Sequence, residues 1–469
     1  MFKKLEKYLF YLLLFSIPFQ TRKILWYEGW RFNEWTSVSI YFTDVLFFIL
    51  FLFWLYNSFL STTPKVKSKK LKIKSAIQNF KVYEYFLIIF LAVSAISITN
   101  STNPIVSWFQ WLKLLEFSVF YWYLVNYALK KFGLYNSFLA IFVGGIFQSV
   151  IAIIQFFKQS STGLRFLGES IINSDLSGIA SFYLPTGEKV IRVYGTTPHP
   201  NVLAVYLFLA LFSFYFIYLY SRLHSEHQPL ADSWDVKSRW DHVPLRDKVT
   251  LVFYGVLLLA FLTTFSRTII FVWFASFCLR VIIIRLRRNY RLSFGTKDGR
   301  KRIKAILLVS FCVLVIFSSF YFNEIKVRLT ISGEDQAIEL RTFYAKESLK
   351  IGFNLFGVGI GNFVGWLAEN KSNLPNYTYQ PVHNIYLLVY SETGVLGILS
   401  FVVFLIYIIK DFILKTNLQR PYQLSFLVFF CSLLFIGFFD HLFLTIQQGS
   451  LVLWGSLGIL TFISNSDII

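Results

Sequence analysis

The chain alternates between long apolar runs and short polar connections. An apolar run of about 20 residues is long enough for a helix to cross the hydrocarbon core of a bilayer. The runs do not alternate with period two, as the strands of an outer-membrane barrel do. We therefore predict an all-α polytopic membrane protein with about twelve membrane-spanning helices. The predicted spans are 5–20, 38–60, 82–99, 106–128, 136–157, 200–221, 249–265, 268–284, 305–322, 384–409, 422–444 and 449–465.

Two polar connections, 158–199 and 323–383, are much longer than the others. In the second, Ser332–Asp335 has the composition of a helix N-cap, with an acidic residue three positions on. Behind it, one apolar stripe with Arg341 beside it predicts an amphipathic loop helix. The stripe consists of Ala337, Leu340, Tyr344 and Ile351. The glycines at 357–361 then predict a flexible turn.

The basic residues divide unequally between alternate connections. The set 1–7, 61–81, 129–135, 222–248, 285–304 and 410–421 holds 29 Lys and Arg, and the opposite, longer set holds 14. Loops rich in Lys and Arg stay on the cytoplasmic side. We therefore predict that both termini are cytoplasmic and that 158–199 and 323–383 face outward.

Composition supports this class of protein. The chain is 56% apolar and 15% charged, with a mean hydropathy of +0.57, which is typical of helical membrane proteins. The net charge is +20, and the basic residues lie in short loops. The preference of Lys- and Arg-rich loops for the cytoplasmic side explains them, so we predict no nucleic-acid partner. No small-residue cleavage site follows the first apolar run, which predicts a first membrane helix rather than a removed signal peptide. We expect residues 1–469 to form one integral membrane domain.

Metal and disulfide chemistry are not indicated. The three cysteines, Cys278, Cys312 and Cys431, are far apart within apolar spans, where they are typical small core residues. His224-x-x-His227 has the spacing of a metal pair, but no further ligand accompanies it, which favours a solvated loop. The outward loops contain no Asp-x-Asp pair, so we predict neither a metal nor a cofactor.

Polar residues that could do chemistry cluster at the predicted outward ends of the spans. They are Arg192, Gly195, His199 and Asn201; Thr263, Ser266 and Arg267; Arg341, His383 and Asn384; and Asp440 with His441 as a possible fourth contributor. A guanidinium binds phosphate through two parallel hydrogen bonds and stays protonated. Several arginines facing one outward cavity therefore indicate a diphosphate ligand.

Each of these residues also has a structural interpretation. An arginine at a membrane boundary can extend toward the headgroups, although Arg267, between two short spans, is expected to point into the bundle. His383 is either a helix cap or a group that exchanges protons near neutrality. His199 and Asn201 have the chemistry of a helix start as well as that of a substrate site.

With these motifs in this order, the chain resembles the O-antigen ligase and polymerase family of bacterial membrane glycosyltransferases. The resemblance covers about 190–400: Arg-x-x-Gly with His-Pro-Asn, Thr-x-Ser-Arg, the long outward loop with Gly-Val-Gly-x-Gly-Asn-Phe, and the block from His383 through Glu392-Thr-Gly394. The first 190 residues match only as a hydropathy pattern.

The resemblance implies a metal-independent transfer on the outer face of the bacterial cytoplasmic membrane. Glycan would pass from a polyprenyl-diphosphate carrier to a hydroxyl of lipid A–core or of another glycan acceptor. By their motifs, Arg192 and Arg267 would hold the diphosphate and His383 would act at the anomeric centre or on the departing phosphate. Arg341, His199, Asn201, Ser266 and Asn384 would bind substrate.

Three alternatives stay open. A polymerase of the same family would transfer to carrier-linked glycan. A lipid-linked glycan transporter would also have about twelve helices, but it predicts repeat symmetry and paired broken helices, and the sequence shows no such repeat. A scaffold would tolerate replacement of the arginines.

Overall fold

The structure, a computed structural model, describes residues 2–29, 32–59, 81–220, 244–286, 297–330, 336–416, 418 and 421–465. Each predicted span overlaps one long helix. These helices are α1 (Phe2–Phe15), α2 (Phe42–Phe59), α4 (Val82–Ser97), α5 (Pro104–Tyr123), α7 (Leu134–Lys158), α8 (Pro200–Tyr215), α9 (Pro244–Thr263), α10 (Arg267–Leu286), α12 (Lys297–Phe320), α16 (Ile385–Thr416), α17 (Pro421–Ile436) and α19 (Gln447–Asn465). The predicted N-cap at Ser332–Asp335 and the His224-x-x-His227 loop lie outside the described residues.

The protein is a mostly helical membrane protein. In the described part of the chain, five helical segments are long and apolar enough to cross a membrane alone. They are Val82–Asn100, Leu134–Lys158, Pro200–Leu219, Gly299–Phe320 and Ile385–Thr416. Phe42–Asn57, Lys248–Thr263 and Pro421–Ile436 are apolar but shorter. The total of twelve spans stays a prediction.

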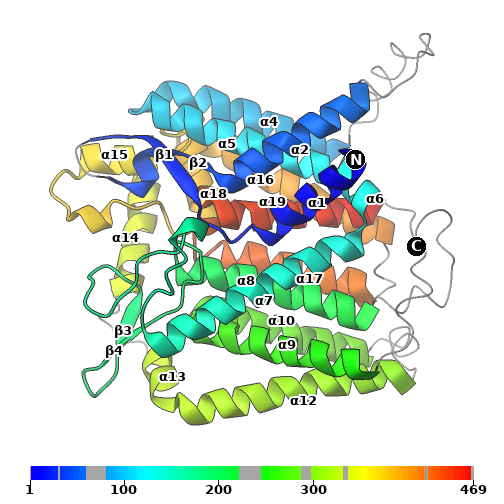
Figure 1. Cartoon of the computed structure of the whole chain (residues 1–469). Helices are drawn as coiled ribbons and strands as arrows, with labels where there is room; N and C mark the ends of the chain where they lie inside the picture. The colour runs from blue at the N-terminus through cyan, green and yellow to red at the C-terminus, as the bar shows by residue number, and fades with distance from the viewer. Residues whose placement is uncertain are drawn as a thin grey trace, which may run out of the picture.

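Short elements gather at one end of the bundle (Figure 1). They are the hairpin β1 (Arg22–Tyr27) with β2 (Ser37–Tyr41), the hairpin β3 (Ser181–Tyr183) with β4 (Lys189–Ile191), and the helices α13 (Phe322–Leu329), α14 (Gln336–Lys350) and α15 (Phe363–Asn370). The start of α1 and the end of α19 lie at the opposite end. The two long connections therefore share one end of the molecule, away from the chain ends, as the predicted sidedness requires.

Two of the predicted spans differ in extent from the helices of the structure. Residues 38–41, predicted to begin a span, form β2, which pairs antiparallel with β1. The Ser37–Tyr41 segment is rich in β-branched and aromatic residues, which favour a strand. It continues into α2 without a break, so the strand and the helix together formed one apolar run in the sequence. The span predicted at 422–444 ends at Ile436 in α17, and a second short helix, α18 (Leu442–Thr445), follows a non-helical break.

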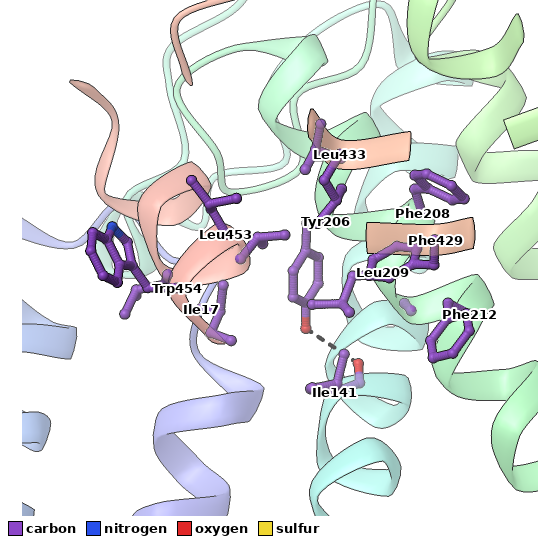
Figure 2. Close-up of a cluster of buried hydrophobic side chains, with 14 of the residues drawn as sticks. Ile17, Ile141, Tyr206, Phe208, Leu209, Phe212, Phe429, Leu433, Leu453 and Trp454 are labelled. Atoms are coloured by element: carbon purple, nitrogen blue, oxygen red, sulfur yellow. Dashed lines mark hydrogen bonds between the residues drawn. The ribbon is translucent and has the colours of Figure 1, made fainter. Parts of the chain in front are cut away.

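Helix α8 forms the centre of the bundle. Every residue from Val202 to Tyr215 is buried, as expected of a helix that is apolar on all sides. Figure 2 shows Tyr206 of α8 between α7 and the helices α17 and α19, where its hydroxyl donates to the carbonyl of Ile141, 3.3 Å away. The Phe212 ring stacks on Phe429 with centroids 4.7 Å apart. This rigid centre fixes His199 and Asn201, which lie at the start of α8.

The glycine turn predicted at 357–361 packs against a kink in α16. Gly394 has φ +72° and ψ −168° inside that helix, so the carbonyls of Ser391 and Glu392 are open to accept from the amides of Val358 and Gly359. A Cβ on Gly357 would lie 2.5 Å from the carbonyl carbon of Glu392. The glycines of both motifs are therefore required where two backbones meet.

We predict that Gly357→Ala destabilises the protein more than Gly187→Ala does. Both glycines have positive φ, but only Gly357 faces backbone; around Gly187 the space is open. Strain at positive φ costs about 1 kcal/mol, and the clash at Gly357 adds to it. Thermal unfolding of the purified proteins in lipid nanodiscs measures the difference, and equal losses would contradict this account of the turn.

Candidate functional site

Two glutamines of α7 determine where Arg192 and His199 lie. The Gln155 side-chain oxygen accepts from the amides of Tyr194 and Gly195, at 3.0 and 2.8 Å. Two turns earlier, Gln148 binds both the amide and the hydroxyl of Thr196. Gly195 has φ +57°, and a Cβ there would lie 2.4 Å from the Gln148 oxygen. The Arg-x-x-Gly motif therefore requires glycine, because the chain passes directly over α7.

Arg192 lies buried among neutral acceptors. Its side chain is 7% exposed. Its Nε donates to the carbonyl of Thr264 at 2.8 Å, and its Nη2 donates to Oδ1 of Asn201 at 2.7 Å. The Ser266 hydroxyl donates to the same oxygen at 3.0 Å. The Asn201 amide nitrogen in turn donates to Asp440, 2.9 Å away. Asn201 thus joins the predicted first and second clusters to Asp440.

The tight turn between α9 and α10 brings further positive charge to Arg192. Phe265 has φ +46°, which is rare for a bulky residue and costs strain. Its carbonyl accepts from Nη2 of Arg328 at 3.3 Å. Arg328 and Arg267 both lie close enough to Arg192 to lower its pKa, which burial and Arg328 bring to about 9. At neutral pH Arg192 therefore remains a cation.

A group of imidazole rings lies beside these arginines. The His383 ring stacks on Tyr344 of α14, with centroids 5.4 Å apart and planes 7° apart. His441 meets His383 edge-on at 4.7 Å. Arg341, one turn before Tyr344, interacts electrostatically with His383, His441 and His199. The Nε of Arg341 is buried without a hydrogen-bond partner in the protein.

Hydrogen bonds determine which nitrogen of each ring has the proton. Nδ1 of His383 lies 3.1 Å from the carbonyl of Pro381. A carbonyl can only accept, so Nδ1 carries the proton and Nε2 of the neutral ring has a free lone pair. In His199, Nδ1 accepts from the amide of Asn201 at 3.2 Å, which leaves the proton on Nε2. His383 can therefore accept a proton where His199 can only donate a hydrogen bond.

Burial keeps these rings neutral. It lowers the pKa of His199 to about 3, with Arg192 as the next cause, and lowers the pKa of His383 below its usual 6.5. Burial alone would raise the pKa of Asp440, but interactions with His441 and His383 and the hydrogen bond from Asn201 lower it to about 2. Around neutral pH the group therefore combines an ionised Asp440, neutral imidazoles and cationic arginines.

The structure brings seven of the eight predicted site residues into one region. Arg192, Asn201 and Ser266 share direct hydrogen bonds, and Arg267, Arg341, His199 and His383 lie within electrostatic range of that group. Asn384 lies next to His383, but its Oδ1 accepts from the amides of Tyr386 and Leu387 and begins α16. Its binding of substrate stays a prediction.

Sequence reasoning did not single out Arg328. Its position in the short helix α13 gave no motif, and only the fold brings it next to Phe265. Asp440 and His441 were predicted only as a possible fourth contributor. The break after α17 turns both toward the site, where Asp440 accepts from Asn201 and His441 contacts His383. In the described residues no three His, Cys, Asp or Glu side chains are arranged to hold a metal ion.

Part of the chain matches a known protein family. Residues 252–402 match the O-antigen ligase family. The predicted resemblance is thus confirmed over this stretch, about a third of the chain, which contains Arg267, Arg328, Arg341 and His383. The O-antigen ligase match supports a membrane enzyme of the ligase or polymerase kind. No curated protein matches the chain.

We predict that Asn201→Ala destabilises the protein by about 1–3 kcal/mol. It removes the bridge between Arg192 and Asp440 and leaves buried polar groups unsatisfied. Asn126→Ala is the matched control, because Asn126 is exposed and its amide binds only the carbonyl of Trp122 in its own helix. Unfolding in nanodiscs compares them, and a loss no larger than that of the control would show that the bridge does not hold the site together.

Proposed function

We propose that the protein transfers glycan from a polyprenyl-diphosphate carrier to an acceptor hydroxyl. The observation that supports this best is that Arg267 and Arg328 lie within electrostatic range of Arg192, and Arg341 within range of His383, at the loop-bearing end of the bundle. Arg192 is held by a carbonyl and an amide oxygen rather than by a carboxylate, and the Nε of Arg341 has no hydrogen-bond partner in the protein, so this region favours an anion. A diphosphate with a lipid tail fits both the charge and the membrane position.

The proposed reaction needs charge stabilisation at one atom and proton removal at another. The bond between the anomeric carbon and the diphosphate oxygen breaks, and its electron pair leaves on the polyprenyl diphosphate. The acceptor oxygen forms the new glycosidic bond, and its proton passes to Nε2 of His383. The arginines stabilise the charge on the leaving diphosphate, so a metal ion is not required for that role.

We further propose the setting in which this happens. The charge bias of the loops supports a multi-pass protein of the bacterial cytoplasmic membrane with cytoplasmic termini. The 158–199 and 323–383 loops would then face outward, and the second would contribute Arg341 and His383. The acceptor is lipid A–core in a ligase and carrier-linked glycan in a polymerase; the chemistry at His383 is the same in both.

Arg267→Ala should lower the transfer rate about 10²- to 10³-fold, as expected for loss of one preorganised charge contact. The assay follows label from a polyprenyl-diphosphate glycan into product, using full-length protein in nanodiscs. Arg165→Ala is the control, because Arg165 is an exposed arginine on the 158–199 loop. The wild-type rate should be unchanged when EDTA is added. Undiminished transfer by Arg267→Ala, or loss of the wild-type rate in EDTA, would overturn the proposal.

The single-turnover rate should be constant from pH 8 to pH 6.5 and fall at lower pH. The pKa of His383 is lowered from 6.5 by burial, so the neutral ring persists into weakly acidic solution and protonates only below that value. A half-maximal rate at or above pH 7 would show that His383 is not the base. His383→Gln should abolish the acidic limb along with most of the rate.

A further inference from the structure

Two adjoining cavities lie beside the imidazole rings, on the side of the N-terminal hairpin. They enclose about 710 and about 410 Å³ of empty space, counting the part open to solvent. They share six lining residues: Gln110, Lys113, Phe117, Leu444, Thr445 and Ser450. We refer to them together as the hairpin cavity. Sequence analysis assigned nothing to this region.

Residues that contact the imidazole rings of the candidate site line the hairpin cavity. The hydroxyl of Thr445, in its wall, is hydrogen-bonded to Nδ1 of His441. Trp35, also in the wall, meets the His441 ring edge-on at 5.0 Å. Pro381, whose carbonyl fixes the tautomer of His383, lines the larger cavity. A molecule in this space would be separated from the two imidazoles only by these side chains.

Two polar atoms in its wall lack a partner in the protein. The hydroxyl of Ser39 and the side-chain oxygen of Gln447 make no hydrogen bond there, although the residues are only 3% and 4% exposed. Both residues line the smaller cavity. A buried polar group without a partner costs about 1–3 kcal/mol, so these atoms indicate a ligand that offers hydrogen bonds.

The two cations of the hairpin cavity are already paired. Arg22 binds Glu34 at 2.9 Å, and Lys113 binds Asp44 at 2.6 Å and Glu116 at 2.9 Å. Glu392 also lines the larger cavity and accepts from the amides of Gly361 and Phe363. With two cations and four acids, this region has no excess positive charge. A phosphate would therefore not be attracted here. Paired charges with uncharged donors, acceptors and aromatic rings suit a neutral ligand with many hydroxyls.

We propose that the hairpin cavity binds the sugar of the acceptor. This inference rests on the proposed glycan transfer and assigns its two substrates to different sides of His383. The donor diphosphate lies with the arginines, and the acceptor sugar lies against Trp35, Ser39 and Gln447. An acceptor hydroxyl that extends past Pro381 and Thr445 then reaches His383, which takes its proton.

Saturation-transfer NMR on the full chain in nanodiscs tests this directly, because it measures sugar binding without catalysis. The probes are a panel of methyl hexosides and methyl disaccharides. Wild type should bind at least one of them. Ser39→Ala should weaken that binding about fivefold or more, the size expected for one lost hydrogen bond, and Ser39→Leu, which fills the cavity, should abolish it. Inorganic diphosphate should not displace the sugar.

Ser94→Ala is the matched control. The hydroxyl of Ser94 is also buried without a partner, but it lines neither cavity, so binding should not change. The proposal is overturned if no glycoside binds wild type, if both Ser39 variants bind as wild type does, or if diphosphate competes. If the protein binds sugar but transfers no glycan, the proposed function is refuted and the sugar site remains supported. If it transfers glycan but binds no sugar, the sugar site is refuted and the proposed function remains supported.

Discussion

Buried positive charge is the constraint on which the loop-bearing end of this protein depends. A buried ion is costly unless hydrogen bonds or opposite charges compensate it. Here Arg192 is compensated by a backbone carbonyl and by the amide of Asn201 rather than by a carboxylate. Neutral acceptors hold the guanidinium in place and leave its charge available to a ligand. A direct carboxylate partner would have held it as firmly but cancelled the field that attracts a phosphate.

The surrounding fold provides the rigidity that this arrangement requires. The buried helix α8 fixes Asn201, the glutamines of α7 fix the chain on either side of Gly195, and the strained turn at Phe265 presents its carbonyls inward. On the other side, the glycine turn joins the 323–383 connection to the kink of α16. Tyr344 and His383 therefore stack at a defined position, although they come from segments about forty residues apart.

Much of the fold and part of the candidate site could be predicted from the sequence, because they depend on local patterns. Apolar runs located the long helices, the charge bias separated the two ends, and the short motifs singled out Arg192, Arg267 and His383, which the fold brings near one another. The interactions that came only from the fold are non-local. Arg328 has no motif, and Asn201 becomes a bridge only when the break after α17 brings Asp440 to it. The hairpin cavity combines β2, α5 and α18, whose polar residues are too far apart in sequence to suggest a site.

The most direct test of the arginine group is equilibrium binding of labelled polyprenyl diphosphate to the full-length protein in nanodiscs, with polyprenyl alcohol as competitor. We expect unlabelled polyprenyl diphosphate to displace the bound label and the alcohol not to displace it. In Arg192→Gln the affinity should fall at least about tenfold, which corresponds to the loss of roughly one charged hydrogen bond. Equal competition by the alcohol, or unchanged affinity in Arg192→Gln, would contradict this account.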